Sequence, residues 1–170
     1  MRIISGTHKG KIITPDKNFK ARPTTDFAKE NLFNVLNNYI DIEDASVLDL
    51  FAGTGSISYE FASRGAGKIV SIELNYNHYA FIKKTAVQLG FKNMTIFKTD
   101  VFIACKKLNG TTFDIIFADP PYNLEKINEI PAAIFNNDLL APDGIAIIEH
   151  PSTVDFSSEP NFFEHRRYGS

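Results

Sequence analysis

Short apolar runs alternate with longer amphipathic segments between residues 46 and 148. A bounded apolar run predicts a buried strand, and apolar residues at three-to-four spacing predict a helix with one buried face. The strands predicted in this way cover residues 47–50, 69–72, 95–97, 115–118 and 145–148. The helices predicted between them cover residues 56–64, 75–89, 101–108 and 124–135, the last with an interruption at Pro131.

This alternation predicts right-handed crossovers and a mostly parallel sheet with helices on both faces, which is an α/β fold. An earlier amphipathic helix is predicted over residues 28–40, with Thr25 or Asp26 as its N-cap. Residues 1–23 contain two short β-prone pieces and predict a small hairpin or ribbon. Residues 140–144 read as a turn before the last strand.

The composition narrows the class of protein without identifying it. With 44% hydrophobic and 22% charged residues, the chain is typical of a soluble globular domain, and 170 residues suffice for one core. No apolar stretch or leader pattern predicts membrane insertion or export, so we expect a cytoplasmic protein. The single cysteine, Cys105, excludes an internal disulfide, and the four histidines lack metal-ligand spacing, so no metal is expected.

Charge is distributed unevenly along the chain. Residues 1–22 carry six basic side chains, among them Arg2, Lys9 and Lys11, and one acidic side chain. The other 148 residues carry 12 basic and 19 acidic side chains. A basic arm on an acidic body favours a polyanionic partner, while a solvated charged ribbon explains the same composition equally well.

The four residues Asp119-Pro120-Pro121-Tyr122 follow the predicted strand 115–118 directly. Proline has no N–H for a sheet ladder, so the chain must leave the sheet here in a stiff turn. A carboxylate, a proline carbonyl and an aromatic ring then stand at the carboxyl end of a strand, where ligands bind in open α/β sheets. This set suits a flat base with an exocyclic amino group. The structural alternative is a rigid connection in which Asp119 caps the next helix.

A glycine loop follows the predicted strand 47–50 and contains Asp49, Phe51, Gly53 and Gly55. Glycines at this position allow a tight turn and close approach of the backbone to a ligand. The dinucleotide fingerprint requires a third glycine where Ser58 stands, which weakens a phosphate-binding interpretation. The acidic Asp49 points instead to a ligand with a cationic end.

Acidic residues end three successive predicted strands: Asp49, Glu73 and Asp100. An acid about 20 residues beyond the glycines typically accepts the ribose hydroxyls of a bound nucleoside, and Asp100 is placed to recognise an adenine amino group. Together they predict a nucleoside that carries a positive charge, which describes S-adenosyl-L-methionine. Taken singly, each acid is as well explained by a helix cap or a solvated loop.

The glycine loop and the Asp-Pro-Pro-Tyr turn resemble those of S-adenosylmethionine-dependent methyltransferases that modify exocyclic amino groups. More narrowly, the chain resembles the bacterial 16S ribosomal RNA guanine-N2 methyltransferases of the RsmD type. The narrower resemblance rests on residues 1–6, 9–10, 22–26, 31–34 and 63–66 and covers nearly the whole chain. It implies a class I, Rossmann-like fold, with a basic extension over residues 1–25 and a methyltransferase domain over residues 26–170.

The resemblance also implies roles for particular residues. The catalytic residues are Asp119, Pro120 and Tyr122. The residues that bind the cofactor are Asp49, Phe51, Gly53, Gly55, Glu73, Asp100, Arg22 and Thr24. The basic arm and the end of the last predicted strand add the residues expected to contact 16S ribosomal RNA, which are Arg2, Lys9, Lys11 and His150. For His150, the alternative is an ordinary hydrogen-bonded loop residue. We expect a monomer that acts on the small subunit or an assembly intermediate. The family normally ends in two antiparallel strands; residues 162–168 are the candidate for one, and the last is expected to be missing.

Three alternatives compete with this hypothesis, the first of them another methyltransferase. A DNA adenine-N6 methyltransferase also acts on an exocyclic amine, but the chain leaves no room for a separate DNA-recognition domain. A nucleotide-binding oxidoreductase is disfavoured by the absent third glycine. A non-catalytic RNA-binding module is disfavoured by the intact acidic residues and the intact Asp119–Tyr122 turn.

Overall fold

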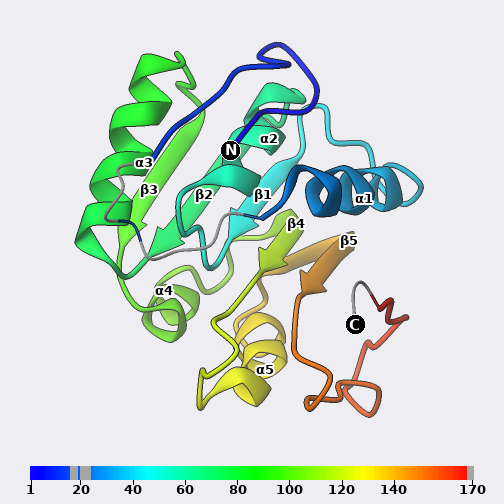
Figure 1. Ribbon diagram of the computed structural model, residues 1–170. Helices are drawn as coiled ribbons and strands as arrows, with labels where there is room; N and C mark the ends of the chain where they lie inside the picture. Colours follow the sequence, from blue (N-terminus) through cyan, green and yellow to red (C-terminus); the bar gives the residue numbers. More distant parts are fainter. Residues whose placement is uncertain (16–18, 20–23, 168–170) are drawn as a thin grey trace.

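The computed structural model describes residues 1–15, 19 and 24–167, and a parallel sheet lies at its centre (Figure 1). Its strands are β1 (Ser46–Asp49), β2 (Lys68–Glu73), β3 (Met94–Lys98), β4 (Phe113–Ala118) and β5 (Leu140–Ile148). Their order across the sheet is β3-β2-β1-β4-β5. From β1 the chain adds β2 and β3 on one side and then β4 and β5 on the other, so the strand order reverses between β1 and β4. This position is the switch point where open α/β sheets bind ligands. The predicted α/β class is confirmed.

The helices are α1 (Asp26–Leu36), α2 (Ser56–Ser63), α3 (Tyr76–Gln88), α4 (Val101–Lys107), the 3-10 turn η1 (Ile127–Glu129) and α5 (Ile130–Phe135). Apart from α1, which precedes β1, the helices lie between the strands, and the helix predicted over residues 28–40 ends earlier, at Leu36. The N-cap of α1 is Thr25, whose hydroxyl accepts a hydrogen bond from the Ala28 N–H at 3.2 Å. Asn75 and Asp100 cap α3 and α4 in the same manner. Polar residues just before apolar periodic segments therefore fix where these helices begin.

The central strands β1, β2 and β4 are buried on both faces, whereas the edge strands β3 and β5 are more exposed. On one face, residues such as Val47 and Ile69 belong to the apolar cluster that includes α1, α2 and α3. On the other face, Leu48 and Val70 belong to the cluster that includes α4 and α5. Successive strand residues point to opposite faces, so a strand covered on both sides must be apolar at every position. Burial of each such side chain contributes about 1.5–3 kcal/mol, which explains the continuous apolar runs.

Two predicted boundaries near the end of the sheet were wrong. Residues 140–144 belong to β5, although they include Pro142 and Gly144. The pairing shifts there, from Phe113 with Leu140 to Ile115 with Ile145, so β5 bulges while it stays in the sheet. The predicted helix over residues 124–135 begins later, as η1 followed by α5. Pro131 lies in the first turn of α5, where its missing N–H costs nothing, so it starts the helix instead of interrupting it.

The segment after β5 forms no strand between residues 149 and 167. The candidate strand at residues 162–168 was therefore wrong over its described part, and the sheet described here ends at β5. The segment packs through single side chains instead. Phe156 is buried in the cluster beside α4 and α5, and Tyr39 donates a hydrogen bond to Glu164 at 2.9 Å.

Residues 1–13 form a short antiparallel ribbon that lies against α2 (Figure 1). Arg2 bridges Ile12, and the Ile3 N–H donates to the Lys11 carbonyl at 2.9 Å. Gly6 has a φ of 82°, and a Cβ at this residue would lie 1.7 Å from the Ser63 carbonyl oxygen. The ribbon turn therefore requires glycine both for its backbone conformation and for its approach to α2.

A buried carboxylate anchors this ribbon. Glu60 of α2 accepts hydrogen bonds from the Ile4 and Ser5 N–H groups at 2.9 and 3.0 Å. It also lies 2.9 Å from the Arg64 guanidinium and 3.6 Å from the Lys29 ammonium of α1. Burial lowers the pKa of Lys29, and the charge of Glu60 opposes that change. Four groups therefore satisfy one fully buried charge and join the ribbon to two helices.

Candidate active site

The Asp119–Tyr122 segment leaves the sheet directly after Ala118, the last residue of β4. Pro120 is buried, whereas the side chain of Tyr122 is 72% exposed. The Pro121 carbonyl accepts a hydrogen bond from the Leu124 N–H at 2.9 Å, which closes a turn. A carboxyl group and an exposed aromatic ring are therefore held by a stiff turn at the carboxyl edge of the sheet.

A second carboxyl group, that of Glu149, lies beside Asp119. Ala118 pairs with Ile148 across β4 and β5, and the Glu149 N–H donates to the Ala118 carbonyl at 2.8 Å. Burial raises the pKa of Asp119. Burial and the charge of Asp119 together raise the pKa of Glu149 to about 7. No role was predicted for Glu149, although it directly follows the apolar run 145–148 at the edge of the sheet where ligands bind.

Asp49 is fully buried at the end of β1, the other neighbour of β4. Its Oδ2 accepts a hydrogen bond from the Ser58 hydroxyl at 2.6 Å, and Ser58 also contacts the Ser71 hydroxyl at 2.8 Å. Its Oδ1 has no hydrogen-bond partner among the described residues. Burial is the main cause that raises the pKa of Asp49 to about 7; the Ser58 hydrogen bond lowers it and nearby Asp119 raises it. A buried acceptor without a donor is a fitting partner for a cationic ligand.

The glycine loop between β1 and α2 is held from both ends. Gly53 has a φ of 56°, and its N–H donates to the Glu73 carboxylate at 2.8 Å. A Cβ at Gly53 would meet no atom within 4 Å, so this part of the loop faces open space. A Cβ at Gly55 would lie 2.6 Å from the Tyr59 ring, so glycine is required there for packing. The loop presents a bare backbone surface that can receive a ligand.

The Glu73 carboxylate lies at the end of β2 and is fixed by backbone groups. One oxygen accepts the Gly53 N–H, and the other accepts the Asn75 N–H at 2.7 Å. The ring of His78 lies 3.8 Å away. Each carboxylate oxygen has two lone pairs, so both can accept a further hydrogen bond from a ligand hydroxyl. Glu73 thus connects the glycine loop to the start of α3.

The other residues predicted to bind the cofactor occupy varied places. Asp100 caps α4 through Oδ1, which accepts the Phe102 and Ile103 N–H groups at 2.9 and 3.2 Å. Phe51 is half-buried and packs against the cluster beside α4 and α5. Thr24 is half-buried just before the N-cap of α1. Arg22 lies outside the described residues.

The structure does not gather the residues predicted to contact RNA around Asp119. Lys9 is exposed at the ribbon turn. Next to it, the His8 N–H donates to the Ser63 hydroxyl, and its ring contacts the Leu89 carbonyl at 2.9 Å. Because α2 and α3 start at the carboxyl edge of the sheet and end away from it, this turn lies toward the opposite edge (Figure 1).

Arg2, Lys11 and His150 differ in how they are held. Arg2 forms an exposed ion pair with Asp26 at 3.1 Å, and Lys11 is exposed on the second half of the ribbon. His150 lies beside Glu149 at the carboxyl edge, where its ring contacts the Pro151 carbonyl at 3.1 Å and packs edge-on against Phe156. Of the four residues predicted to contact RNA, His150 follows β5 directly at the edge that carries Asp119.

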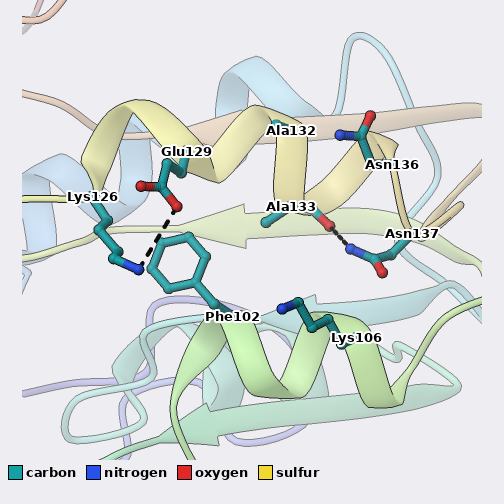
Figure 2. A pocket seen from close by; sticks show the side chains of 8 residues that line it. All are labelled: Phe102, Lys106, Lys126, Glu129, Ala132, Ala133, Asn136 and Asn137. Carbon is teal, nitrogen blue, oxygen red and sulfur yellow. Dashed lines mark hydrogen bonds and ion pairs between the residues drawn. The ribbon is translucent and has the colours of Figure 1, made fainter.

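A separate hollow of about 390 Å³ lies between α4 and α5 (Figure 2). Figure 2 shows the Phe102 ring inside it, with the Lys126 ammonium 4.0 Å from the Glu129 carboxylate at one end. None of the residues predicted for the site lines this hollow, whose walls are Phe102, Lys106, Lys126, Glu129, Ala132, Ala133, Asn136 and Asn137. The hollow is thus distinct from the carboxylates at the ends of β1, β2 and β4.

Two further findings concern only the residues that the structure describes. No helix among them is long and apolar enough to cross a membrane. No three His, Cys, Asp or Glu side chains in that part of the chain lie close enough together to hold a metal ion.

Comparison with known proteins places the whole chain in one family. The family model described as "Conserved hypothetical protein 95" matches residues 1–170. A Ribosomal RNA small subunit methyltransferase D from Escherichia coli (strain K12) is 32% identical over 151 residues, which are 88% of this chain and 74% of that protein. A protein of the same name from Buchnera aphidicola subsp. Baizongia pistaciae is 31% identical and covers 91% of this chain and 78% of its own length.

Solved structures give the same result for the fold. The structure of yhhF from Escherichia coli has a TM-score of 0.87 and 29% identity, and it covers 100% of this chain and 92% of its own. A more distant structure, SMU.776 complexed with SAH, has a TM-score of 0.61 and 22% identity over 72% of this chain and 35% of its own. The chain therefore belongs to the family of the small-subunit ribosomal RNA methyltransferases D and has the class I, S-adenosylmethionine-dependent methyltransferase fold.

Proposed function

We propose that this protein transfers a methyl group from S-adenosyl-L-methionine to the exocyclic N2 of a guanine in 16S ribosomal RNA. The observation that carries the proposal is the half-buried Asp119 carboxyl in the stiff turn after β4, beside the exposed Tyr122 ring. The names of the relatives support a ribosomal RNA substrate in the small subunit. The proposed setting is the cytoplasm, where small subunits are assembled.

The residues around the glycine loop fit the proposed cofactor. The free Oδ1 of Asp49 suits a cationic group, the open face of Gly53 leaves room for a ligand, and Glu73 has lone pairs for ribose hydroxyls. Asp100 retains a second carboxylate oxygen beyond the one that caps α4. S-adenosyl-L-methionine supplies a methyl group already activated by a sulfonium. The chain has to bind and orient it next to the acceptor nitrogen.

Asp119 is proposed to activate the acceptor nitrogen. The lone pair of an exocyclic amine is delocalised into the base, which makes the nitrogen a poor nucleophile. An ionised Asp119 accepts one amino hydrogen, and the Pro120 carbonyl accepts the other, so the lone pair turns out of the ring plane. The nitrogen gains positive charge as the new bond forms. A fixed negative Asp119 in a half-buried site therefore stabilises the transition state more than the ground state.

Tyr122 is proposed to hold the base by stacking. Its ring is exposed, so one face is available to a base that has left its own stack. Stacking of this kind contributes about 1–3 kcal/mol per base. His150, which follows β5 at the same edge as Asp119, is proposed to contact the RNA near the target. Arg2, Lys9 and Lys11 on the ribbon are proposed to contact phosphates farther from the target.

The test is transfer of label from radioactive S-adenosyl-L-methionine to DNA, naked ribosomal RNA or undermethylated small subunits, followed by digestion to nucleosides. We expect N2-methylguanosine from the RNA-containing substrates. Label in N6-methyladenine from DNA would support the adenine-N6 alternative instead. No label in any nucleic acid, from a protein that binds the cofactor, would contradict methylation of nucleic acid altogether.

A further inference from the structure

The ends of β4 and β5 place two carboxyl groups side by side. The strands run parallel, Ala118 pairs with Ile148, and the next residues along the two chains are Asp119 and Glu149. The 2.8 Å hydrogen bond from the Glu149 N–H to the Ala118 carbonyl extends the ladder to this point. Neighbouring strands lie about 4.8 Å apart, so two groups on one flat base can reach both residues at once.

The Glu149 side chain has no structural partner in the described part of the chain. Its backbone N–H completes the sheet ladder, but its carboxylate forms no hydrogen bond or ion pair with residues 1–15, 19 or 24–167. The carboxyl is half-buried next to the charge of Asp119, and both conditions disfavour its ionised form. An ionised Glu149 therefore destabilises the free protein, and a ligand that donates a hydrogen bond to its carboxylate would offset this loss of stability.

Guanine offers such a donor next to the methylated amine. Its N1–H and its N2 amino group are adjacent donors on the same edge of the base. Adenine carries an acceptor, N1, next to its N6 amino group. An ionised carboxylate beside the residue that binds the amine therefore attracts the guanine edge and repels the adenine edge, and the hydrogen bond from the guanine N1–H favours that ionised form. Enzymes that act on an extruded base read this edge through hydrogen bonds.

We propose that Glu149 accepts a hydrogen bond from the N1–H of the target guanine, and thereby selects guanine over other bases with an exocyclic amine. This inference rests on the proposed guanine-N2 activity and adds the residue that determines specificity. Asp119 and the Pro120 carbonyl bind the N2 amine, and Glu149 reads the neighbouring ring nitrogen. The sheet ladder depends on the backbone of residue 149, so a change of its side chain leaves the ladder intact.

A base that keeps the amine and loses the N1–H tests this role. 2-Aminopurine has the 2-amino group, but its N1 is an acceptor. Once the methylated guanine has been located, 2-aminopurine is placed at that position in an otherwise identical RNA. We expect the wild-type protein to prefer guanine in kcat/KM by about 100-fold or more, because a site built for a donor rejects an analogue without it.

The variant Glu149→Gln carries an amide, whose N–H can donate to the N1 of 2-aminopurine. We expect the preference for guanine to fall by about tenfold or more in this variant. Glu129→Gln is the matched control, since it removes an exposed carboxylate in η1 and should keep the wild-type preference. A merely structural role for Glu149 lowers both rates equally and leaves the ratio unchanged.

The outcomes separate this inference from the function on which it rests. If the wild-type protein methylates no guanine N2, the proposed function fails. If it methylates guanine N2 but accepts 2-aminopurine equally well, the function stands and the role of Glu149 is overturned. An unchanged ratio in Glu149→Gln overturns it also. If the variant does not fold, the wild-type protein is compared on guanine and 1-deazaguanine, which keeps O6 and the amine and has C–H in place of N1–H; equal kcat/KM for the two overturns the role of Glu149.

Discussion

Single acidic residues in this protein both hold loops and face the candidate site. Glu73 accepts backbone N–H groups from the glycine loop and from the start of α3, and Asp100 caps α4. Asp49 uses one oxygen for Ser58 and leaves the other buried without a partner among the described residues. The structural and ligand-binding explanations are therefore compatible, because each carboxylate has more lone pairs than its loop uses.

The buried charge of Asp49 leads to a prediction at this scale. We expect Asp49→Asn to stabilise the free protein, because it removes a charge that burial disfavours while it keeps an acceptor for Ser58. The same change should weaken cofactor binding by about 10–100-fold, since a hydrogen bond to a charged group is lost. Thermal unfolding without ligand and titration calorimetry with S-adenosyl-L-methionine measure the two effects. Unchanged affinity in the variant would show that Asp49 does not contact the cofactor.

At the scale of elements, the ribbon is held against α2 by hydrogen bonds to Glu60 and by the close approach of Gly6 to Ser63. Gly6 and Gly10 have the same φ of 82°, but only Gly6 has an atom within reach of an added Cβ. We expect Gly10→Ala to destabilise the protein by about 1–2 kcal/mol, the cost of a left-handed conformation. Gly6→Ala should cost clearly more, because its Cβ would overlap the Ser63 carbonyl.

Urea unfolding of the two glycine variants measures this difference. Limited proteolysis should cut the ribbon of Gly6→Ala before the rest of the chain and spare that of Gly10→Ala. Equal losses of stability in the two variants would mean that the ribbon does not need its close approach to α2.

Local patterns predicted most elements, because a strand buried on both faces has to be apolar at every position. Local patterns gave wrong boundaries where the same residue type is compatible with two different structures. Pro142 and Gly144 are typical of a turn, yet here they occupy a bulge inside β5. Pro131 is typical of a helix break, yet it lies in the first turn of α5.

For the candidate site, too, the sequence predicted which residues end a strand but not which strands are neighbours. Asp49, Glu73 and Asp119 follow apolar runs, so their positions at strand ends could be predicted from the sequence. The pairing of Asp119 with Glu149 could not, because it depends on which strand lies next to β4. The contact of Glu60 with residues near the start of the chain joins segments 55 and 56 residues apart, and no local pattern encodes it.

At the scale of the whole molecule, the carboxyl groups at the strand ends set how stability depends on pH. Burial raises the pKa of both Asp49 and Glu149 to about 7, from usual values near 4. A raised pKa in the folded state favours folding below pH about 4, and that contribution is lost as the pH rises through about 7. We expect thermal stability without ligand to fall between about pH 4 and pH 7, and to fall less in Asp49→Asn/Glu149→Gln.

Asp114 has a lowered pKa, so it affects stability at a lower pH than Asp49 and Glu149 do. Hydrogen bonds from Ser46 lower the pKa of Asp114, so its contribution is lost only as the pH falls below the usual carboxyl range. Equal pH dependence of unfolding in the wild-type protein and the double variant would contradict the assignment to Asp49 and Glu149.

The uneven charge of the molecule predicts how RNA binding responds to salt. The net charge is −2, so attraction to phosphates has to come from local basic groups such as Lys9 and Lys11. Each lost phosphate contact reduces the slope of log affinity against log salt by about 0.7–0.9. We expect Lys9→Ala/Lys11→Ala to reduce the slope by about 1.4–1.8. Lys106→Ala/Lys107→Ala, on exposed residues of α4, is the matched control. Equal slopes for the two double variants would place the RNA elsewhere.

The central claim is that Asp119 activates a guanine N2 amine for methylation. The most direct measurement is nucleoside analysis of small-subunit RNA after reaction with wild-type protein and with Asp119→Asn, together with the cofactor affinity of each. We expect N2-methylguanosine as the labelled product of the wild-type protein, and a loss of methylation of about 100-fold or more in the variant at nearly unchanged cofactor affinity. Undiminished methylation by Asp119→Asn, or label on a different base, would contradict this claim.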